Sequence, residues 1–108
     1  DAIVVSNHGG RAFEAVTGTA DALPAIARSV KQMTVLADGG VRSGADVLKM
    51  LALGAEAVLI GRPAIIVGMG GEEEGVRMLL ARMRRQLLEG MLLTGCASIR
   101  ETGPHLLA

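Results

Sequence analysis

Short apolar runs and longer amphipathic segments alternate along this chain. The runs 2–6, 34–37 and 57–60 are rich in Val, Ile and Leu, and a polar, glycine-containing turn follows each of them. Continuous apolar runs of this length are typical of strands buried on both faces of a parallel sheet. The pattern therefore predicts three buried strands, with a longer segment after each.

The segment after the first strand has the spacing of an amphipathic helix. We expect Asp21 to be its N-cap and Pro24 to lie in its first turn, where a missing N–H costs nothing. Four apolar residues follow the i, i+3, i+4, i+7 rule. They are Leu23, Ile26, Ala27 and Val30.

Two more helices are expected after the second and third strands. Residues 45–53 have helix-forming composition, with Ser43 as a plausible N-cap and Gly54 as the stop. A long helix is expected at about 72–94, and 63–71 is interpreted as a glycine-containing connection.

The order of elements predicts an α/β fold. Three strand-then-helix units of about 30 residues each, joined by right-handed crossovers, give parallel strands. They form either a small open sheet or the last part of a barrel, because a complete (β/α)8 barrel needs about 250 residues. The chain begins at Asp1 without Met and enters a strand almost at once, so we expect it to be a fragment.

The turns after the second and third strands have the composition of a phosphate site. Residues 38–44 read DGGVRSG, and Gly61-Arg62 follow the third strand. Glycines let backbone N–H groups approach an anion, a helix N-terminus adds the positive end of its dipole, and arginines supply forked donors. In barrels, phosphate commonly binds after the last two strands.

Composition narrows the function classes. The chain has 108 residues, half of them apolar, and carries eleven charges of each sign. This allows one domain and gives no net field that would recruit nucleic acid or a membrane. One Cys and two distant His residues offer neither a disulfide framework nor a metal site, and the lone thiol favours a reducing, cytoplasmic location.

Four motifs resemble one known family. They are SNHGGR (Ser6–Arg11), DALP (Asp21–Pro24), the stretch Asp38–Pro63 and LTGCASI (Leu93–Ile99). They are similar to the FMN-dependent 2-hydroxy-acid oxidases and dehydrogenases, which include glycolate oxidase, lactate oxidase, flavin-type lactate dehydrogenases and mandelate dehydrogenase. SNHGGR is the specific signal, whereas other barrels that hold FMN or phosphate share D-G-G-x-R…G-R. The resemblance implies that residues 1–108 are a single C-terminal fragment, the last three βα units of a TIM (β/α)8 barrel.

The resemblance also assigns roles to residues. His8 corresponds to the family's active-site base, and Arg11 to the residue that holds the substrate carboxylate. From the residues alone, His8 could equally be a turn histidine that caps backbone groups. The positions that match the family's contacts with FMN are Asp38, Gly39, Gly40, Arg42, Gly61 and Arg62. Among them, Gly39 is expected to act through its backbone conformation.

The function implied by the resemblance is oxidation of an L-2-hydroxy acid to the 2-oxo acid with FMN as electron acceptor. The alternatives are an FMN- or phosphate-binding module of a different enzyme, and an inactive truncated module. The expected partner is a small 2-hydroxy acid, with no nucleic acid and no metal. The parent protein is expected to be a homo-oligomer in the cytoplasm, with membrane association of that parent left open.

The sequence departs from the family in two respects. Ala12-Phe13-Glu14 follow SNHGGR where the family usually has Gln-Leu-Asp. The family also uses a lysine, a carboxylate that orients the histidine, and commonly two tyrosines, all from earlier in the chain. This chain has no Tyr, so we expect it to be inactive alone.

Overall fold

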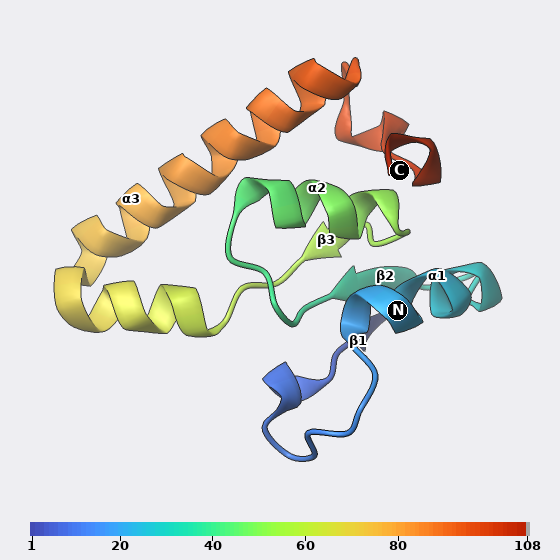
Figure 1. Ribbon diagram of the computed structural model, residues 1–108, viewed down its shortest axis with the longest axis horizontal. Coiled ribbons are helices and arrows are strands. Elements are labelled where there is room, and N and C mark those ends of the chain that lie inside the picture. The colour runs from blue at the N-terminus through green and yellow to red at the C-terminus, as the bar shows by residue number, and fades with distance from the viewer. Residues whose placement is uncertain (108) are drawn as a thin grey trace.

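Three short strands pair in parallel and in chain order. The computed structural model describes residues 1–107, and its sheet has the order β1 (Ala2–Val5), β2 (Thr34–Ala37), β3 (Ala57–Val58) (Figure 1). Ala2 lies opposite Thr34, and Leu36 lies opposite Ala57. The predicted parallel sheet is confirmed. Because the strands are parallel, the turns that follow them meet at one edge.

A helix follows each strand. The α-helices are α1 (Thr19–Ser29), α2 (Gly44–Ala52) and α3 (Arg62–Thr94). Three single-turn 3₁₀ helices complete the described chain: η1 (His8–Gly10), η2 (Ile99–Glu101) and η3 (Pro104–Leu106). None of the helices within residues 1–107 is long and apolar enough to cross a bilayer.

The predicted start of α1 was wrong. Gly18, not Asp21, is the N-cap, and its carbonyl oxygen accepts hydrogen bonds from the Asp21 and Ala22 N–H groups. Asp21 therefore lies in the first turn, where its charge faces the positive end of the helix dipole. Pro24 lies inside the helix rather than in its first turn.

The segment 63–71 was also predicted wrongly, because it is helical. α3 begins at Arg62 with Pro63 in its first turn, and the glycines that follow do not stop it. A glycine inside a helix costs only about 1 kcal/mol, so its presence alone does not end one. The break comes at Glu72, whose backbone is at φ +51°, ψ −140°. Figure 1 shows α3 as a yellow and an orange arm that meet at this bend.

The core lies between the sheet and the three helices. Its buried side chains come from the sheet and from each α-helix: Val5, Val35 and Ala37 from the strands, Leu23 from α1, Met50 from α2 and Met83 from α3. Cys96 is buried as a free thiol in a smaller cluster with Leu48 and Met91.

A close approach at Gly44 fixes α3 against α2. A Cβ atom on Gly44 would overlap the Met83 carbonyl oxygen and the Leu87 nitrogen. At the same point the Gly44 N–H donates to Gln86 Oε1 at 3.0 Å. The first turn of α2 thus packs directly on the backbone of the second arm of α3.

This packing gives a stability prediction. Gly44→Ala should destabilise the protein by about 3 kcal/mol, because backbone atoms cannot move aside as a flexible side chain can. Gly70→Ala is the matched control, since a Cβ added at Gly70 would meet no atom within 4 Å. Urea unfolding of both variants tests this. Equal stability of the two would show that α2 and α3 do not depend on the contact.

Candidate functional site

A cleft of about 690 Å³ opens at the edge where the three strands end. It is lined by the turns after β1, β2 and β3 and by both arms of α3. All eight residues assigned from the sequence line it: His8, Arg11, Asp38, Gly39, Gly40, Arg42, Gly61 and Arg62. The structure therefore brings into one cleft residues that lie far apart in the sequence.

The turn after β1 holds His8 in an uncommon backbone conformation. His8 has φ +54°, which few residues other than glycine adopt. Two side chains maintain this turn: Ser6 Oγ accepts from the His8 N–H, and Asn7 Oδ1 accepts from the Gly9 N–H, both at 3.0 Å. Such backbone strain persists only where the surrounding structure enforces it, and it is common at functional sites. The His8 side chain is exposed at the mouth of the cleft.

A hydrogen bond joins the first turn to the third. The Arg62 guanidinium donates to the Gly9 carbonyl oxygen at 3.2 Å. A Cβ on Gly9 would lie 2.9 Å from that same guanidinium, and the φ of +67° at this position favours glycine. Arg62 is thereby tied to the backbone next to His8.

The turn after β2 leaves an oxygen without a partner. The Asp38 N–H donates to the Val5 carbonyl oxygen at 3.1 Å, which fixes Asp38 beside the end of β1. Asp38 Oδ1 is buried and accepts no hydrogen bond from residues 1–107. Gly39 and Gly40 follow with φ of +94° and +76°, and the space around Gly40 is open. A ligand hydroxyl would satisfy Asp38 Oδ1.

The N-terminus of α2 closes this turn. Ser43 is the N-cap, as predicted, and its Oγ accepts from the Asp46 N–H at 3.2 Å. Asp46 Oδ2 in return accepts from the Ser43 hydroxyl at 2.8 Å and from the Arg42 N–H at 3.1 Å. Arg42 therefore offers the cleft its exposed guanidinium rather than its backbone N–H.

The cleft is strongly cationic. Four arginines line it, against the single carboxylate of Asp38. Sequence reasoning missed Arg82, which reaches the cleft from the second arm of α3. No local signal marks this residue, because the bend at Glu72 brings its helix back to the site. Arg82 adds to a field that favours anions.

Comparison with known proteins identifies the family. A model of the FMN-dependent dehydrogenase family matches residues 1–108. The chain belongs to this family. An L-lactate dehydrogenase of Xanthomonas campestris pv. campestris is 51% identical over 102 residues, which cover 94% of this chain and 26% of that protein. An L-lactate dehydrogenase of Pseudomonas aeruginosa is 49% identical, with 94% and 27% covered.

Solved structures of the family agree with the fold. A crystal structure of mandelate oxidase with benzoyl-formic acid superposes with a TM-score of 0.88 at 44% identity, over 93% of this chain and 30% of that one. The resemblance found in the sequence is confirmed. The chain spans about a quarter of the length of the curated relatives.

The capping of α2 gives a pH prediction. Burial raises the pKa of Asp46, but hydrogen bonds from Ser43 and Arg42, with the Lys49 charge, outweigh it and leave the pKa below its usual 3.8. The stabilisation is thus present above pH 3.8 and lost as pH falls through the folded value.

Asp46→Ala should therefore destabilise the protein at pH 7 by up to about 1 kcal/mol. The difference should shrink at pH 3, because the unfolded chain protonates this carboxylate below its ordinary pKa of 3.8 while the folded chain resists protonation. Urea unfolding at both pH values measures this, with the exposed Glu14→Ala as control. A loss of equal size at both pH values would contradict the electrostatic account.

Proposed function

We propose that this chain is the part of an FMN-dependent 2-hydroxy-acid dehydrogenase or oxidase that holds the flavin phosphate and carries the base. The observation that carries the proposal is the single cleft shared by all eight family-matched residues. The L-lactate dehydrogenases and the mandelate oxidase are named for 2-hydroxy acids, which supports this substrate class.

The cleft residues fit the groups of FMN. Arg42 and Arg62 would hold the phosphate, together with the N-terminus of α3, where the N-cap Gly61 has no side chain that could cap the helix. Asp38 Oδ1, buried without a partner among the described residues, would accept from a ribityl hydroxyl. Gly39 and Gly40 let the backbone approach the cofactor. Bound FMN supplies the two-electron acceptor of the oxidation.

His8 and Arg11 act on the substrate. The Arg11 guanidinium binds the carboxylate of the hydroxy acid as a forked pair, which fixes the reacting carbon. The oxidation removes two electrons and two protons from the substrate, and the His8 imidazole takes one of these protons. The Asn7 and Ser6 hydrogen bonds hold the His8 turn in place for this transfer.

The sheet fits the last three βα units of a TIM barrel. Each strand is followed by a helix, and the site lies at the carboxyl ends of the strands, as it does in such barrels. Val4 on β1 and Leu59 after β3 are 50% and 41% exposed. Strands from the rest of a barrel would cover these side chains and complete the site. The cytoplasmic location and the homo-oligomeric parent stay predictions.

The role of His8 can be tested in the enzyme that contains this chain. His8→Gln should leave FMN bound and slow flavin reduction by about 10²–10⁴-fold, since it removes only the base. Stopped-flow absorbance measures the reduction. His105→Gln is the control, because this exposed histidine lies outside the cleft. Reduction at the wild-type rate in His8→Gln would refute the assignment.

The two arginine roles can be separated. Arg42→Ala should weaken FMN binding and leave the substrate KM of flavin-saturated enzyme unchanged. Arg11→Lys should raise KM and leave FMN affinity unchanged, because an ammonium cannot replace the fork. Arg62→Ala should resemble Arg42→Ala but also slow reduction, since Arg62 holds the carbonyl next to His8. Flavin-fluorescence titration and steady-state kinetics measure these effects; the reverse pattern would mean that the two sites are exchanged.

A further inference from the structure

Thr19 carries a buried hydroxyl with no role so far. The residue is 4% exposed, and its Oγ1 makes no hydrogen bond to any residue from 1 to 107. The only other such oxygen in that range is Asp38 Oδ1, which the proposed function uses. Buried hydroxyls are rarely left unpaired, because desolvation costs free energy that a partner must offset.

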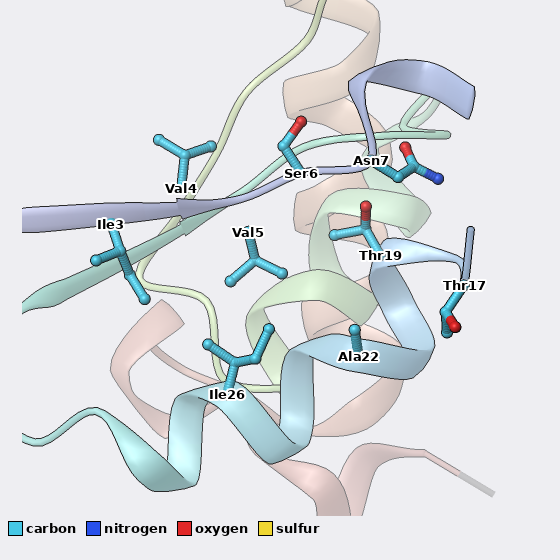
Figure 2. Close-up of a pocket in the computed structure, with 9 residues that line it drawn as sticks. All are labelled: Ile3, Val4, Val5, Ser6, Asn7, Thr17, Thr19, Ala22 and Ile26. Atoms are coloured by element: carbon cyan, nitrogen blue, oxygen red, sulfur yellow. The ribbon is translucent and has the colours of Figure 1, made fainter. Parts of the chain in front are cut away.

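The Thr19 hydroxyl lies next to the turn that holds His8. Thr19 opens α1 and lines a second, smaller cavity of about 260 Å³ between β1 and α1. Figure 2 shows its hydroxyl pointing towards Asn7. A Cβ on Gly39 would lie 2.9 Å from Thr19 Oγ1 and 2.9 Å from Asn7 Oδ1. Both oxygens thus lie 2.9 Å from the same position, so the distance between them is at most twice this value.

Asn7 Oδ1 has the capacity to accept a second hydrogen bond. It already accepts from the Gly9 N–H at 3.0 Å, which shows that the oxygen, not the nitrogen, of the carboxamide faces the turn. A carbonyl oxygen has two lone pairs, and a threonine hydroxyl can rotate to donate. A small rotation of the Asn7 side chain, or one water molecule, closes the gap.

We propose that Thr19 is a positioning residue of the active site. Its hydroxyl donates to Asn7 Oδ1 and fixes the carboxamide that holds Gly9, and through Gly9 the backbone of His8. The Gly9 carbonyl oxygen also accepts a hydrogen bond from Arg62. The same contact therefore fixes the turn that links His8, the proposed base, to Arg62, which is proposed to bind the phosphate. A side chain at Gly39 would crowd both oxygens, because its Cβ would lie 2.9 Å from each of them.

The test compares Thr19→Val, Thr19→Ser and Thr17→Val in the FMN-loaded enzyme that contains this chain. Thr17 lines the same cavity but is exposed and is not among the atoms nearest to a Cβ on Gly39, so it is the control. Thr19→Val should slow flavin reduction about three- to ten-fold, with substrate KM and FMN affinity within about two-fold of wild type. Thr19→Ser should restore the rate, and Thr17→Val should not change it.

Two further readouts separate positioning from packing. Thr19→Val should speed deuterium exchange in the peptide that contains residues 6–10, measured by mass spectrometry without substrate. In a double-mutant cycle, Thr19→Val should add nothing to the effect of Asn7→Ala on reduction. If Thr19→Val does not fold, Thr19→Ala replaces it in every arm.

The proposal is overturned if Thr19→Val keeps the wild-type rate and exchange, because the hydroxyl would then be an unpaired group. It is also overturned if Thr17→Val slows reduction as much, or if Thr19→Val and Asn7→Ala are additive. The kinetic arm rests on the proposed role of His8, whereas the exchange arm does not. If His8→Gln leaves reduction unchanged while Thr19→Val still loosens residues 6–10, the role of His8 fails and the Thr19 contact stands.

Discussion

The parallel pairing of three short strands is the constraint on which the site depends. The candidate site residues stand in the turns that follow the strands, and a helix separates each turn from the next strand along the chain. Parallel register places all three turns at one edge, where a cationic cleft forms. The Arg62–Gly9 hydrogen bond then joins the outer turns across the middle one. A strand reversed in direction would carry its turn to the opposite edge.

The position of α3 is the second requirement. The glycine at position 44 lets the N-terminus of α2 touch the backbone of α3, and Gln86 completes that contact. The bend at Glu72 turns the helix back so that both of its arms border the cleft. The wall of the site, Arg82 included, thus depends on a contact that Gly44 makes only two residues after Arg42.

Local signals in the sequence were sufficient to predict much of the fold and most of the candidate site residues. Apolar runs located the strands, Ser43 located the start of α2, and the family motifs named eight residues that share a cleft. The predictions failed at two helix starts. Glycines after Pro63 indicated a loop, but that segment is helical, and Gly18 rather than Asp21 is the N-cap of α1. Arg82 and Thr19 could not be found, because only the folded chain places them beside the site.

The central claim is that the turns after β2 and β3 hold the phosphate of FMN while His8 and Arg11 face the substrate. A crystal structure of the enzyme that contains this chain, with FMN bound, tests it most directly. The phosphate oxygens should lie within about 3 Å of donor atoms from Arg42, Arg62 or the Gly61 turn. A phosphate bound elsewhere, with these arginines in solvent, would contradict the account.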